Sequence, residues 1–421
     1  MNVLINPKKL HGDVIVPSSK SISHRAIIAA SLSKGTSVIS NIILSEDIKA
    51  TINAVKALGA KVEILDDKVV IEGGIPYRKE SVIDANESGS TLRFMIPIAL
   101  TVDDAITFVG NNNLVNRPLD AYFDIFNKQG IKYSHKDAYL PLMVEGKLKS
   151  GIYEIPGNVS SQYITGLLFA LPLLDGNSVL RLTTSLESKG YVDLTLDVLA
   201  RFGIEIINND YKEFIINGNQ KYKPCDYMVE SDYSQAAFFL VLAALGNDIK
   251  LYNMNQSSLQ GDKKILADLE AFGCKVNMNG DCITVDANNL EGATIDFSQT
   301  PDLGPAVAIL GALSNGKTKF VNASRLRLKE SDRISCMVSE LEKMGVEVIE
   351  HSDGMTISGI KNLKGATIDS HNDHRIAMAF AVAASCATSP VKILNAECVN
   401  KSYPDFWNVY ESLGGEITYE K

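Results

Sequence analysis

The order of apolar and polar positions along the chain follows one pattern that occurs six times. In each copy a helix with one apolar face ends at a glycine, and a short stretch typical of a strand follows. The six glycines are 69 to 73 residues apart; they are Gly59, Gly130, Gly203, Gly273, Gly345 and Gly414. Glycine can adopt the left-handed conformation that closes a helix, because it has no Cβ atom. The pattern therefore predicts six helices with left-handed glycines at their ends.

A second family of helices runs in step with the first and is apolar on nearly every face. These segments are residues 23–32, 90–100, 161–174, 234–245, 302–313 and 373–384. A helix that is apolar all round is typical of a protein core. Each segment opens with a small polar or charged residue that suits a helix N-cap. The chain thus reads as about six copies of a roughly 70-residue α/β unit with two helices and several strands.

The length of 421 residues favours two domains over a single core. A solenoid is the other interpretation of a repeat, but solenoid units usually have about 20 to 50 residues and polar terminal copies. Here the copies are longer and the terminal ones are as apolar as the rest. We therefore expect three repeats in each of two domains, with the midpoint near residue 230. The strand before residue 17 has no helix of its own, so we expect it to join the second half.

Composition narrows the class of protein. Hydrophobic residues make up 45% and charged residues 22% of the chain, which is typical of a soluble globular protein. The net charge of -9 disfavours a nucleic-acid binder, so any anion site must come from local clusters of cations. The apolar runs are shorter than the roughly 20 residues that span a bilayer. The six cysteines form no C-x-x-C pair, which predicts free thiols and no zinc site. We expect a cytoplasmic protein.

Cations and hydroxyls gather at the starts of the core helices of the first half. A helix N-terminus favours acidic residues, so basic residues there suggest that an anion binds among them. The P-loop is excluded, because its glycines are absent. Taken singly, each of these residues has an ordinary explanation as a helix cap or a surface cation. Counting also the neutral residues and those that precede other helices, the candidates of the first half are Lys20, Ser21, Arg25, Gly89, Arg93, Arg117, Ser160, Ser161, Gln162 and Ser188.

The second half carries a corresponding set of charged residues. It comprises Asp302, Lys329, Glu330, Arg333, Asp373, His374, Arg375 and Lys401. If the six repeats are equivalent, their core helices point the same way and their N-termini converge on one face of each domain. Two such faces across a cleft would form a positive pocket for a small polyanion. Asp302, Glu330 and His374 are the groups there that could move protons.

Four stretches, KSISHR, LKESDR, NDHR and KSYPD, occur in this order over nearly the entire chain. Together they resemble the 5-enolpyruvylshikimate-3-phosphate (EPSP) synthase family, enolpyruvyl transferases of the shikimate pathway. The resemblance implies two domains of three βαβαββ units each, forming an inside-out α/β barrel with the active site between them. It places residues 1–12 with 231–421 in one domain and residues 13–230 in the other. No metal or cofactor motif is evident.

The implied reaction transfers enolpyruvyl from phosphoenolpyruvate to the 5-hydroxyl of shikimate 3-phosphate through a tetrahedral intermediate and releases phosphate. The resemblance assigns shikimate 3-phosphate to Lys20, Ser21, Arg25, Ser160, Ser161, Gln162, Ser188, Asp302 and Lys329. It assigns phosphoenolpyruvate to Lys20, Gly89, Arg117, Gln162, Arg333, Arg375 and Lys401. Asp302 is the expected base at the 5-hydroxyl, and Glu330 with Lys20 is expected to deliver a proton to carbon. His374 is a further candidate for proton transfer.

One stretch departs from the family pattern. Many members have Asn-Ala-Gly-Thr where this chain has Glu87-Ser88-Gly89-Ser90. A glutamate near phosphoenolpyruvate is unfavourable unless it turns away or pairs with a cation, so sensitivity to glyphosate, which competes for that site, stays open.

Two alternatives remain. One is the sister enzyme that transfers enolpyruvyl to UDP-N-acetylglucosamine, but it uses a cysteine on a mobile loop, and no cysteine here lies in a comparable place. The other is a non-catalytic anion-binding protein. In the main interpretation the partners are two small-molecule substrates, without nucleic acid or membrane, and the protein is a monomer.

Overall fold

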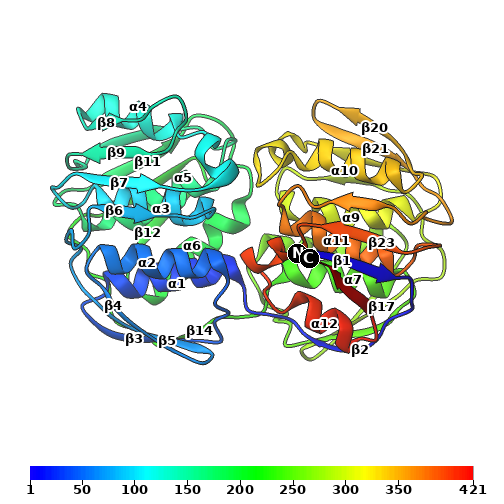
Figure 1. Ribbon diagram of the computed structural model, residues 1–421. Coiled ribbons are helices and arrows are strands. Elements are labelled where there is room, and N and C mark those ends of the chain that lie inside the picture. Colours follow the sequence, from blue (N-terminus) through cyan, green and yellow to red (C-terminus); the bar gives the residue numbers. More distant parts are fainter. Residues whose placement is uncertain (421) are drawn as a thin grey trace. The chain divides into compact units, whose positions relative to one another are not determined.

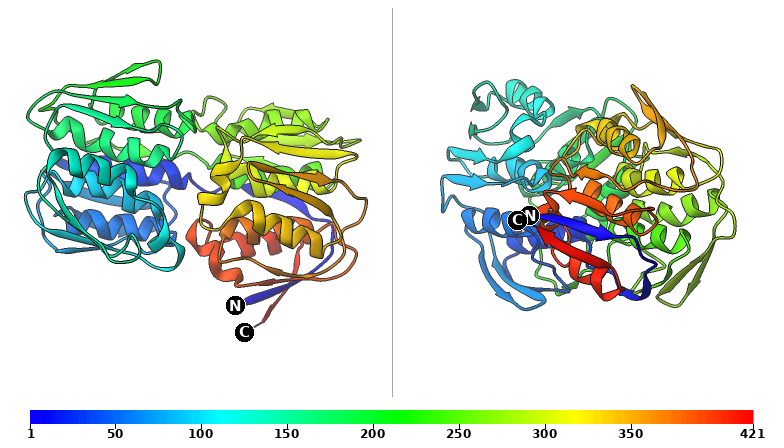
Figure 2. Two further views of the ribbon diagram at one scale, coloured as in Figure 1. Left: turned by 90° about the horizontal axis from the view of Figure 1, so that it is seen from above. Right: turned by 45° about the vertical axis from the view of Figure 1, so that its right-hand side comes forward.

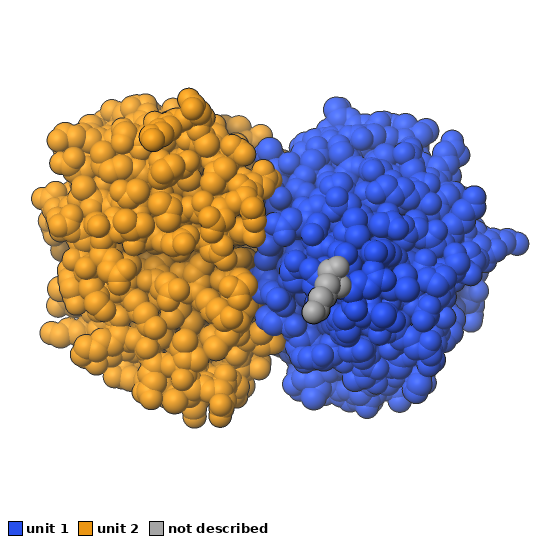
Figure 3. Space-filling model, in the orientation of Figure 1, with its two compact units in different colours: residues 1–17, 230–421 blue, residues 18–229 orange. Residues whose placement is uncertain are grey.

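The computed structural model describes residues 1–420 and divides the chain into two compact units. Unit 1 comprises Met1–Pro17 and Glu230–Lys421, and unit 2 comprises Ser18–Val229 (blue and orange in Figure 3). The sequence placed the first boundary at residue 12. In the structure the strand His11–Ile15 pairs within unit 1, so the chain stays in that unit through Pro17.

Each unit contains three helices that are buried nearly all round and three that are amphipathic. In unit 2 the core helices are α1 (Lys20–Leu32), α3 (Gly89–Ala99) and α5 (Ser161–Ala170), and the others are α2 (Glu46–Ala57), α4 (Asp120–Gln129) and α6 (Lys189–Arg201). In unit 1 the core helices are α7 (Tyr233–Ala244), α9 (Gly304–Ala312) and α11 (His374–Ala384), and the others are α8 (Ile265–Ala271), α10 (Arg333–Lys343) and α12 (Phe406–Ser412). These core helices are the six segments that the apolar pattern predicts.

The strands of unit 2 form three four-stranded sheets. In spatial order, the first sheet consists of β14 (Tyr227–Met228), β3 (Gly35–Ser40), β5 (Lys68–Gly73) and β4 (Lys61–Leu65). The second consists of β6 (Val82–Asp84), β7 (Ile106–Val109), β9 (Leu142–Glu145) and β8 (Lys132–Ser134). The third consists of β10 (Ile152–Ile155), β11 (Ser178–Leu182), β13 (Glu213–Ile216) and β12 (Ile206–Asn209). Each sheet has one parallel pair and two antiparallel pairs.

Unit 1 has three sheets of the same kind. The first consists of β16 (Lys275–Asn279), β17 (Cys282–Asp286), β15 (Asp248–Tyr252) and β2 (His11–Ile15). The second consists of β18 (Thr294–Asp296), β19 (Lys317–Val321), β21 (Gly354–Ser358) and β20 (Glu347–His351). The third consists of β22 (Thr367–Asp369), β23 (Val391–Leu394), β1 (Asn2–Asn6) and β24 (Glu416–Glu420). The chain order within a repeat, as in β6-α3-β7-α4-β8-β9, is βαβαββ. The predicted fold class is confirmed.

Strands from distant parts of the sequence complete the sheets. In unit 1, β2 pairs in parallel with β15, and β1 lies between β23 and β24. Figure 2 shows β1 and β24 side by side in both views. In unit 2 the final strand, β14, pairs in parallel with β3 from the start of the unit. The N-terminal strands therefore belong with the second half of the chain, as the sequence predicts.

The core helices pack closely against one another inside each unit. In unit 1, α7, α9 and α11 are in mutual contact (Figure 1). In unit 2, α3 and α5 approach each other at Gly166, where a Cβ atom would lie 2.4 Å from the carbonyl oxygen of Arg93. Only glycine fits there, and the approach fixes the start of α3 relative to α5. Among residues 1–420, every helix is too short or too polar to cross a membrane.

All six glycines predicted as left-handed have positive φ, between 71° and 97°. Gly130 offers the cleanest test of this constraint, because a Cβ atom there would meet nothing within 4 Å. We expect Gly130→Ala to lower the free energy of unfolding by roughly 1–2 kcal/mol through backbone strain alone. The check is the urea midpoint of the variant.

Gly74→Ala is the matched control. Gly74 has equally open space around its Cβ position, but its φ lies outside the left-handed region. The control should leave the midpoint unchanged or raise it slightly. Equal midpoints for the two variants would contradict the role of the left-handed conformation.

Candidate active site

Arg25 lies in the second turn of α1, and its side chain is buried in unit 2. Its guanidinium donates hydrogen bonds to the hydroxyls of Thr195 and Thr165, at 2.8 and 3.4 Å. It also donates to the carbonyl oxygens of Ser21 and Tyr191, at 2.7 and 2.9 Å. All four acceptors are neutral, and burial lowers the pKa of Arg25 to about 10. A buried cation whose partners in residues 1–420 are all neutral indicates a site for an anion.

Two more arginines meet at the start of α3. A Cβ atom at Gly89 would lie 2.6 Å from Nη1 of Arg117 and 3.0 Å from Nη1 of Arg93. The buried Arg93 donates to Oε1 of Gln162 at 2.9 Å and to the carbonyl oxygen of Pro118 at 3.0 Å, which are again neutral acceptors. Two guanidinium groups this close repel each other unless an anion binds beside them. Glycine at position 89 keeps the helix start open for such an anion.

The first turns of the neighbouring helices add polar groups to this cluster. Lys20, the first residue of α1, pairs with Asp47 of α2, with 2.7 Å between Nζ and Oδ2. Ser160 caps α5 by accepting from the backbone N–H of Gln162 at 3.3 Å. The amide of Gln162 also donates to the hydroxyl of Ser90 at 3.0 Å. Gln162 therefore links the start of α5 to the start of α3.

In unit 1 the charged residues gather around Asp302, which precedes α9 in the short helix Pro301–Leu303. One carboxylate oxygen of Asp302 lies 2.9 Å from Nη1 of Arg333 and 3.0 Å from Nζ of Lys329. The other oxygen lies 3.4 Å from Nη2 of Arg375. The Asp302 side chain is 17% exposed, so solvent or a ligand can reach a carboxylate held by three cations.

Arg333 organises the acidic side of this cluster. Its side chain is fully buried and contacts three carboxylates: Asp302, Glu330 at 2.7 Å and Asp373 at 2.8 Å. Burial alone would lower the pKa of Arg333, but Asp373, Glu330 and Asp302 raise it instead. Burial would likewise raise the pKa of Asp373, and Arg333 reverses that shift. Arg333 is therefore a fixed positive charge at neutral pH.

The remaining cations and the histidine lie next to these groups. Burial lowers the pKa of Lys329, although Asp302 opposes the shift. His374 begins α11 and is 1% exposed, with Nδ1 3.8 Å from Oδ1 of Asp373. Lys401 donates to the carbonyl oxygen of Asn372, just before Asp373.

Comparison with known proteins identifies the family to which the chain belongs. A family model described as "EPSP synthase (3-phosphoshikimate 1-carboxyvinyltransferase)" matches residues 4–410. A 3-phosphoshikimate 1-carboxyvinyltransferase of Clostridium novyi is 50% identical, covering 99% of this chain and 98% of the relative. One of Clostridioides difficile is 48% identical, covering 98% and 97%. A solved EPSP synthase structure from Acinetobacter baumannii has 26% identity and a TM-score of 0.81, covering 99% of this chain and all of that one.

The chain belongs to the EPSP synthase family. Its members are enzymes of the shikimate pathway, and the relatives named above do not favour the sister transferase. The predicted fold, the two-domain inside-out α/β barrel of EPSP synthases, agrees with the match to solved structures.

Most residues that the EPSP synthase pattern selects lie in one of two clusters, one in each unit. The unit 2 cluster contains Lys20, Arg25, Gly89, Arg117, Ser160 and Gln162, and the unit 1 cluster contains Asp302, Lys329, Glu330, Arg333, His374, Arg375 and Lys401. Ser21 adjoins the first cluster, because its carbonyl oxygen accepts from Arg25. Ser161 is the buried first residue of α5, and Ser188 is the buried residue before α6.

Glu87 lies at the edge of the unit 2 cluster. One of its carboxylate oxygens accepts from the side-chain amide of Asn112, at 2.9 Å, in the short helix Asn112–Asn116. The glutamate that departs from the usual EPSP synthase pattern is thus engaged by the segment that leads to Arg117. Among residues 1–420 no group of three or more His, Cys, Asp or Glu side chains is placed to hold a metal ion.

Sequence reasoning missed the roles of several residues in the clusters. The sequence marks Arg93 only as a cation at a helix start and assigns it no ligand. In the structure its guanidinium and that of Arg117 both lie next to Gly89. Asp47 and Asp373 anchor Lys20 and Arg333. Asp262, in the short helix Gly261–Lys264, accepts from the hydroxyl of Ser234, and no pattern in the sequence marks it.

Asp262 gives a prediction about pH. Burial, and then the nearby Asp302, raise the pKa of Asp262 to about 6, above the ordinary 3.8, while Arg375 opposes the shift. As pH rises from about 4 to about 6, the unfolded chain loses this proton first, so the raised pKa destabilises the folded state and the cost persists above pH 6. We expect Asp262→Asn to remove this cost and to raise the free energy of unfolding by up to about 3 kcal/mol at pH 7.5.

The measurement is urea unfolding at pH 7.5 and at pH 4, where the gain should shrink towards zero. Asp286→Asn, at an exposed position in β17, is the control and should show no such pH dependence. A gain that is equal at both pH values, or a loss at pH 7.5, would contradict the assignment.

Proposed function

We propose that the two clusters take part in one reaction, in which both bind the anionic substrates and unit 1 supplies the base, Asp302. As a member of the EPSP synthase family, the chain transfers the enolpyruvyl group of phosphoenolpyruvate to the 5-hydroxyl of shikimate 3-phosphate and releases phosphate. The observation that supports this proposal is a contrast between the buried arginines of the two units. Arg25 and Arg93 of unit 2 have neutral partners, whereas Arg333 of unit 1 contacts three carboxylates.

The proposed binding residues come from both clusters. Shikimate 3-phosphate is assigned to Lys20, Ser21, Arg25, Ser160, Ser161, Gln162, Ser188, Asp302 and Lys329. Phosphoenolpyruvate is assigned to Lys20, Gly89, Arg117, Gln162, Arg333, Arg375 and Lys401, and the geometry at Gly89 adds Arg93 as a positioning residue. Arg93 donates to the side-chain oxygen Oε1 of Gln162, so that the side-chain nitrogen Nε2 of Gln162 faces Ser90.

Asp302 is proposed as the base that takes the proton from the 5-hydroxyl. Bound to Lys329, Arg333 and Arg375, its carboxylate is a weak base, because three cations stabilise the charged form. Arg375 makes the longest of these contacts, 3.4 Å, and is assigned to phosphoenolpyruvate. When Arg375 turns to the substrate carboxylate, Asp302 loses one cation and becomes a stronger base.

The proton balance needs a second group. The 5-oxygen forms a bond to C2 of phosphoenolpyruvate while the methylene carbon gains a proton, which gives a tetrahedral intermediate. Loss of one proton from the new methyl group and departure of phosphate then restore the double bond. Glu330 with Lys20 is proposed to deliver and remove the proton at carbon, and His374 is the further candidate. The surrounding cations stabilise the anionic intermediate.

The cellular setting is part of the proposal. We propose that the protein acts in the cytoplasm as a monomer and that its partners are the two small-molecule substrates. We also propose that residues 1–17 function with residues 230–421 as one domain, and residues 18–229 as the second domain.

The reaction itself is tested by phosphate release from phosphoenolpyruvate with either shikimate 3-phosphate or UDP-N-acetylglucosamine as the acceptor. We expect release with shikimate 3-phosphate only. Release only with the nucleotide sugar would overturn the acceptor assignment. Release with neither would favour the non-catalytic alternative.

The role of Asp302 gives a further prediction. Asp302→Asn keeps the size of the side chain but removes the base, so kcat should fall by about 10²–10⁴-fold. The measurement is steady-state phosphate release, with Asp286→Asn as a control of the same chemistry outside the cluster. An unchanged kcat in Asp302→Asn would remove Asp302 from the mechanism.

A further inference from the structure

Unit 2 contains a pocket of about 700 Å³ at the opposite ends of its core helices from the anion cluster. Its lining includes Leu32, the last residue of α1, and Thr101, which follows α3. Leu173 and Leu174 contribute from the segment after α5. The pocket therefore lies where the three core helices end, and the cations that start those helices do not reach it.

The floor of the pocket is apolar. Leu32, Leu148, Leu174 and Tyr222 all line it and are 3% to 6% exposed, so their side chains form a fixed surface. Ile75 lies at the edge and is 88% exposed, which is unusual for a large apolar side chain. A floor of this kind favours the apolar part of a ligand, and about 300–1,000 Å³ is the usual size of a small-molecule site.

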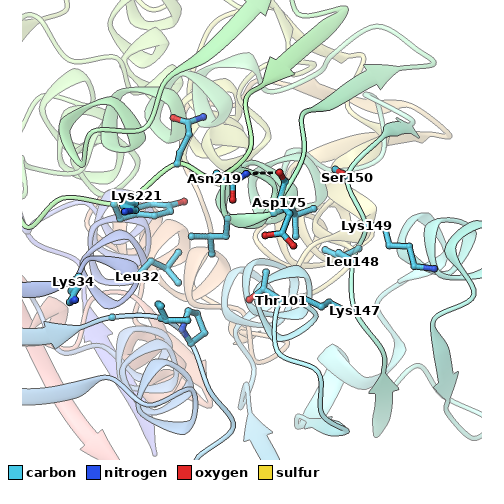
Figure 4. A pocket seen from close by; sticks show the side chains of 17 residues that line it. Leu32, Lys34, Thr101, Lys147, Leu148, Lys149, Ser150, Asp175, Asn219 and Lys221 are labelled. Atoms are coloured by element: carbon cyan, nitrogen blue, oxygen red, sulfur yellow. Dashed lines mark hydrogen bonds between the residues drawn. The ribbon is translucent and has the colours of Figure 1, made fainter.

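The rim of the pocket is basic. Lys34, Lys147, Lys149 and Lys221 line it, and Asp175 is the single acidic residue among the lining residues. Figure 4 shows Lys34 and Lys221 on one side and Lys147 and Lys149 on the other. Within residues 1–420 none of the four ammonium groups makes a hydrogen bond or an ion pair. In a chain of net charge -9, this is a local excess of positive charge.

An ordinary explanation would be that the lysines satisfy carbonyl groups at the helix ends. Backbone N–H groups already do this: Gly74 donates to Ser31 at 3.0 Å and Leu148 to Leu100 at 2.9 Å. Asn219 donates to Leu174 in the same way, at 2.7 Å. The helix ends therefore do not require the lysines.

The corresponding pocket of unit 1 shows the contrast. That pocket, of about 540 Å³, lies at the ends of α7, α9 and α11. There Lys9 donates from Nζ to the carbonyl oxygen of Leu245 at the end of α7, at 2.7 Å. The unit 1 pocket is lined by two lysines, Lys9 and Lys361, of which Lys9 caps a helix, whereas four lysines surround the apolar floor in unit 2.

We propose that the unit 2 pocket binds a small amphipathic anion, an organic molecule with an aromatic or aliphatic body and a carboxylate or sulfonate group. The body packs on the leucines and Tyr222 of the floor, and the charged group lies among the rim lysines. This site is separate from the substrate clusters, and its occupant is neither phosphoenolpyruvate nor shikimate 3-phosphate, which lack an apolar body of this size.

The first test uses the fluorescent anion 8-anilinonaphthalene-1-sulfonate, titrated into the full chain with saturating shikimate 3-phosphate present. We expect one saturable site with a large increase in fluorescence. Lys147→Glu with Lys149→Glu should weaken binding by roughly tenfold or more, because two attractive charges become repulsive. The same charge change at Lys68 and Lys136, exposed positions of unit 2 outside the lining, should alter the Kd by less than about twofold.

Equal weakening by the two double variants, or by neither, would overturn the proposal. Phosphate release should be unchanged in both, since none of these lysines is assigned to the reaction. A failure of the proposed function would therefore appear in the activity assay and leave the dye titration intact.

The second test asks whether the apolar floor contributes. Octanoate should displace the dye at lower concentration than butyrate, and inorganic phosphate should not displace it. Ile75→Ser changes a side chain that is already 88% exposed, so the fold should tolerate it, and it should weaken octanoate more than butyrate. If inorganic phosphate displaced the dye at the same concentration as octanoate, the pocket would bind anions without regard to an apolar body, which would contradict the proposal.

Discussion

The structure depends on how each buried guanidinium group is compensated. A charge removed from water requires opposite charge or hydrogen-bond partners, or it destabilises the fold. Unit 1 gives Arg333 three carboxylates, and unit 2 gives Arg25 and Arg93 only hydroxyl, amide and carbonyl groups. The same repeat therefore yields two different faces. In unit 1 the charge of Arg333 is balanced by carboxylates of the protein, whereas the buried arginines of unit 2 have only neutral partners.

The repeat makes this division possible. Each βαβαββ copy places a buried helix with its start at the same end of the unit, and the left-handed glycines fix where the amphipathic helices stop. A helix start offers free N–H groups and partial positive charge, so three of them form a natural anion site before any side chain is added. Gly89 keeps one start open to a ligand, whereas Gly166 keeps α3 and α5 close enough for Arg93 and Gln162 to meet.

The sequence predicted features that depend on neighbours along the chain. The helix periodicity, the six glycines and the charged helix starts are local, and the structure contains them. The partners of those charges were not predictable, because they come from tertiary contacts: Asp373 is 40 residues from Arg333, and Gln162 is 69 residues from Arg93. Asp262 was missed because its raised pKa depends on burial and on Asp302 rather than on any motif. The unit 2 pocket was missed because loops after three separate helices build it.

Arg333 and Lys329 contact the same oxygen of Asp302 but differ in how burial affects their charge. Arginine keeps its charge when buried, and three carboxylates raise the pKa of Arg333 further, so it holds Asp302, Glu330 and Asp373 in a constant arrangement. Lysine is more easily neutralised by burial, and burial lowers the pKa of Lys329 because Asp302 compensates it only in part. A substrate phosphate or carboxylate near Lys329 would restore that compensation. Lys329 and the more distant Arg375 are therefore the cations in this cluster whose interactions gain most from a bound anion, whereas Arg333 preserves the geometry around them.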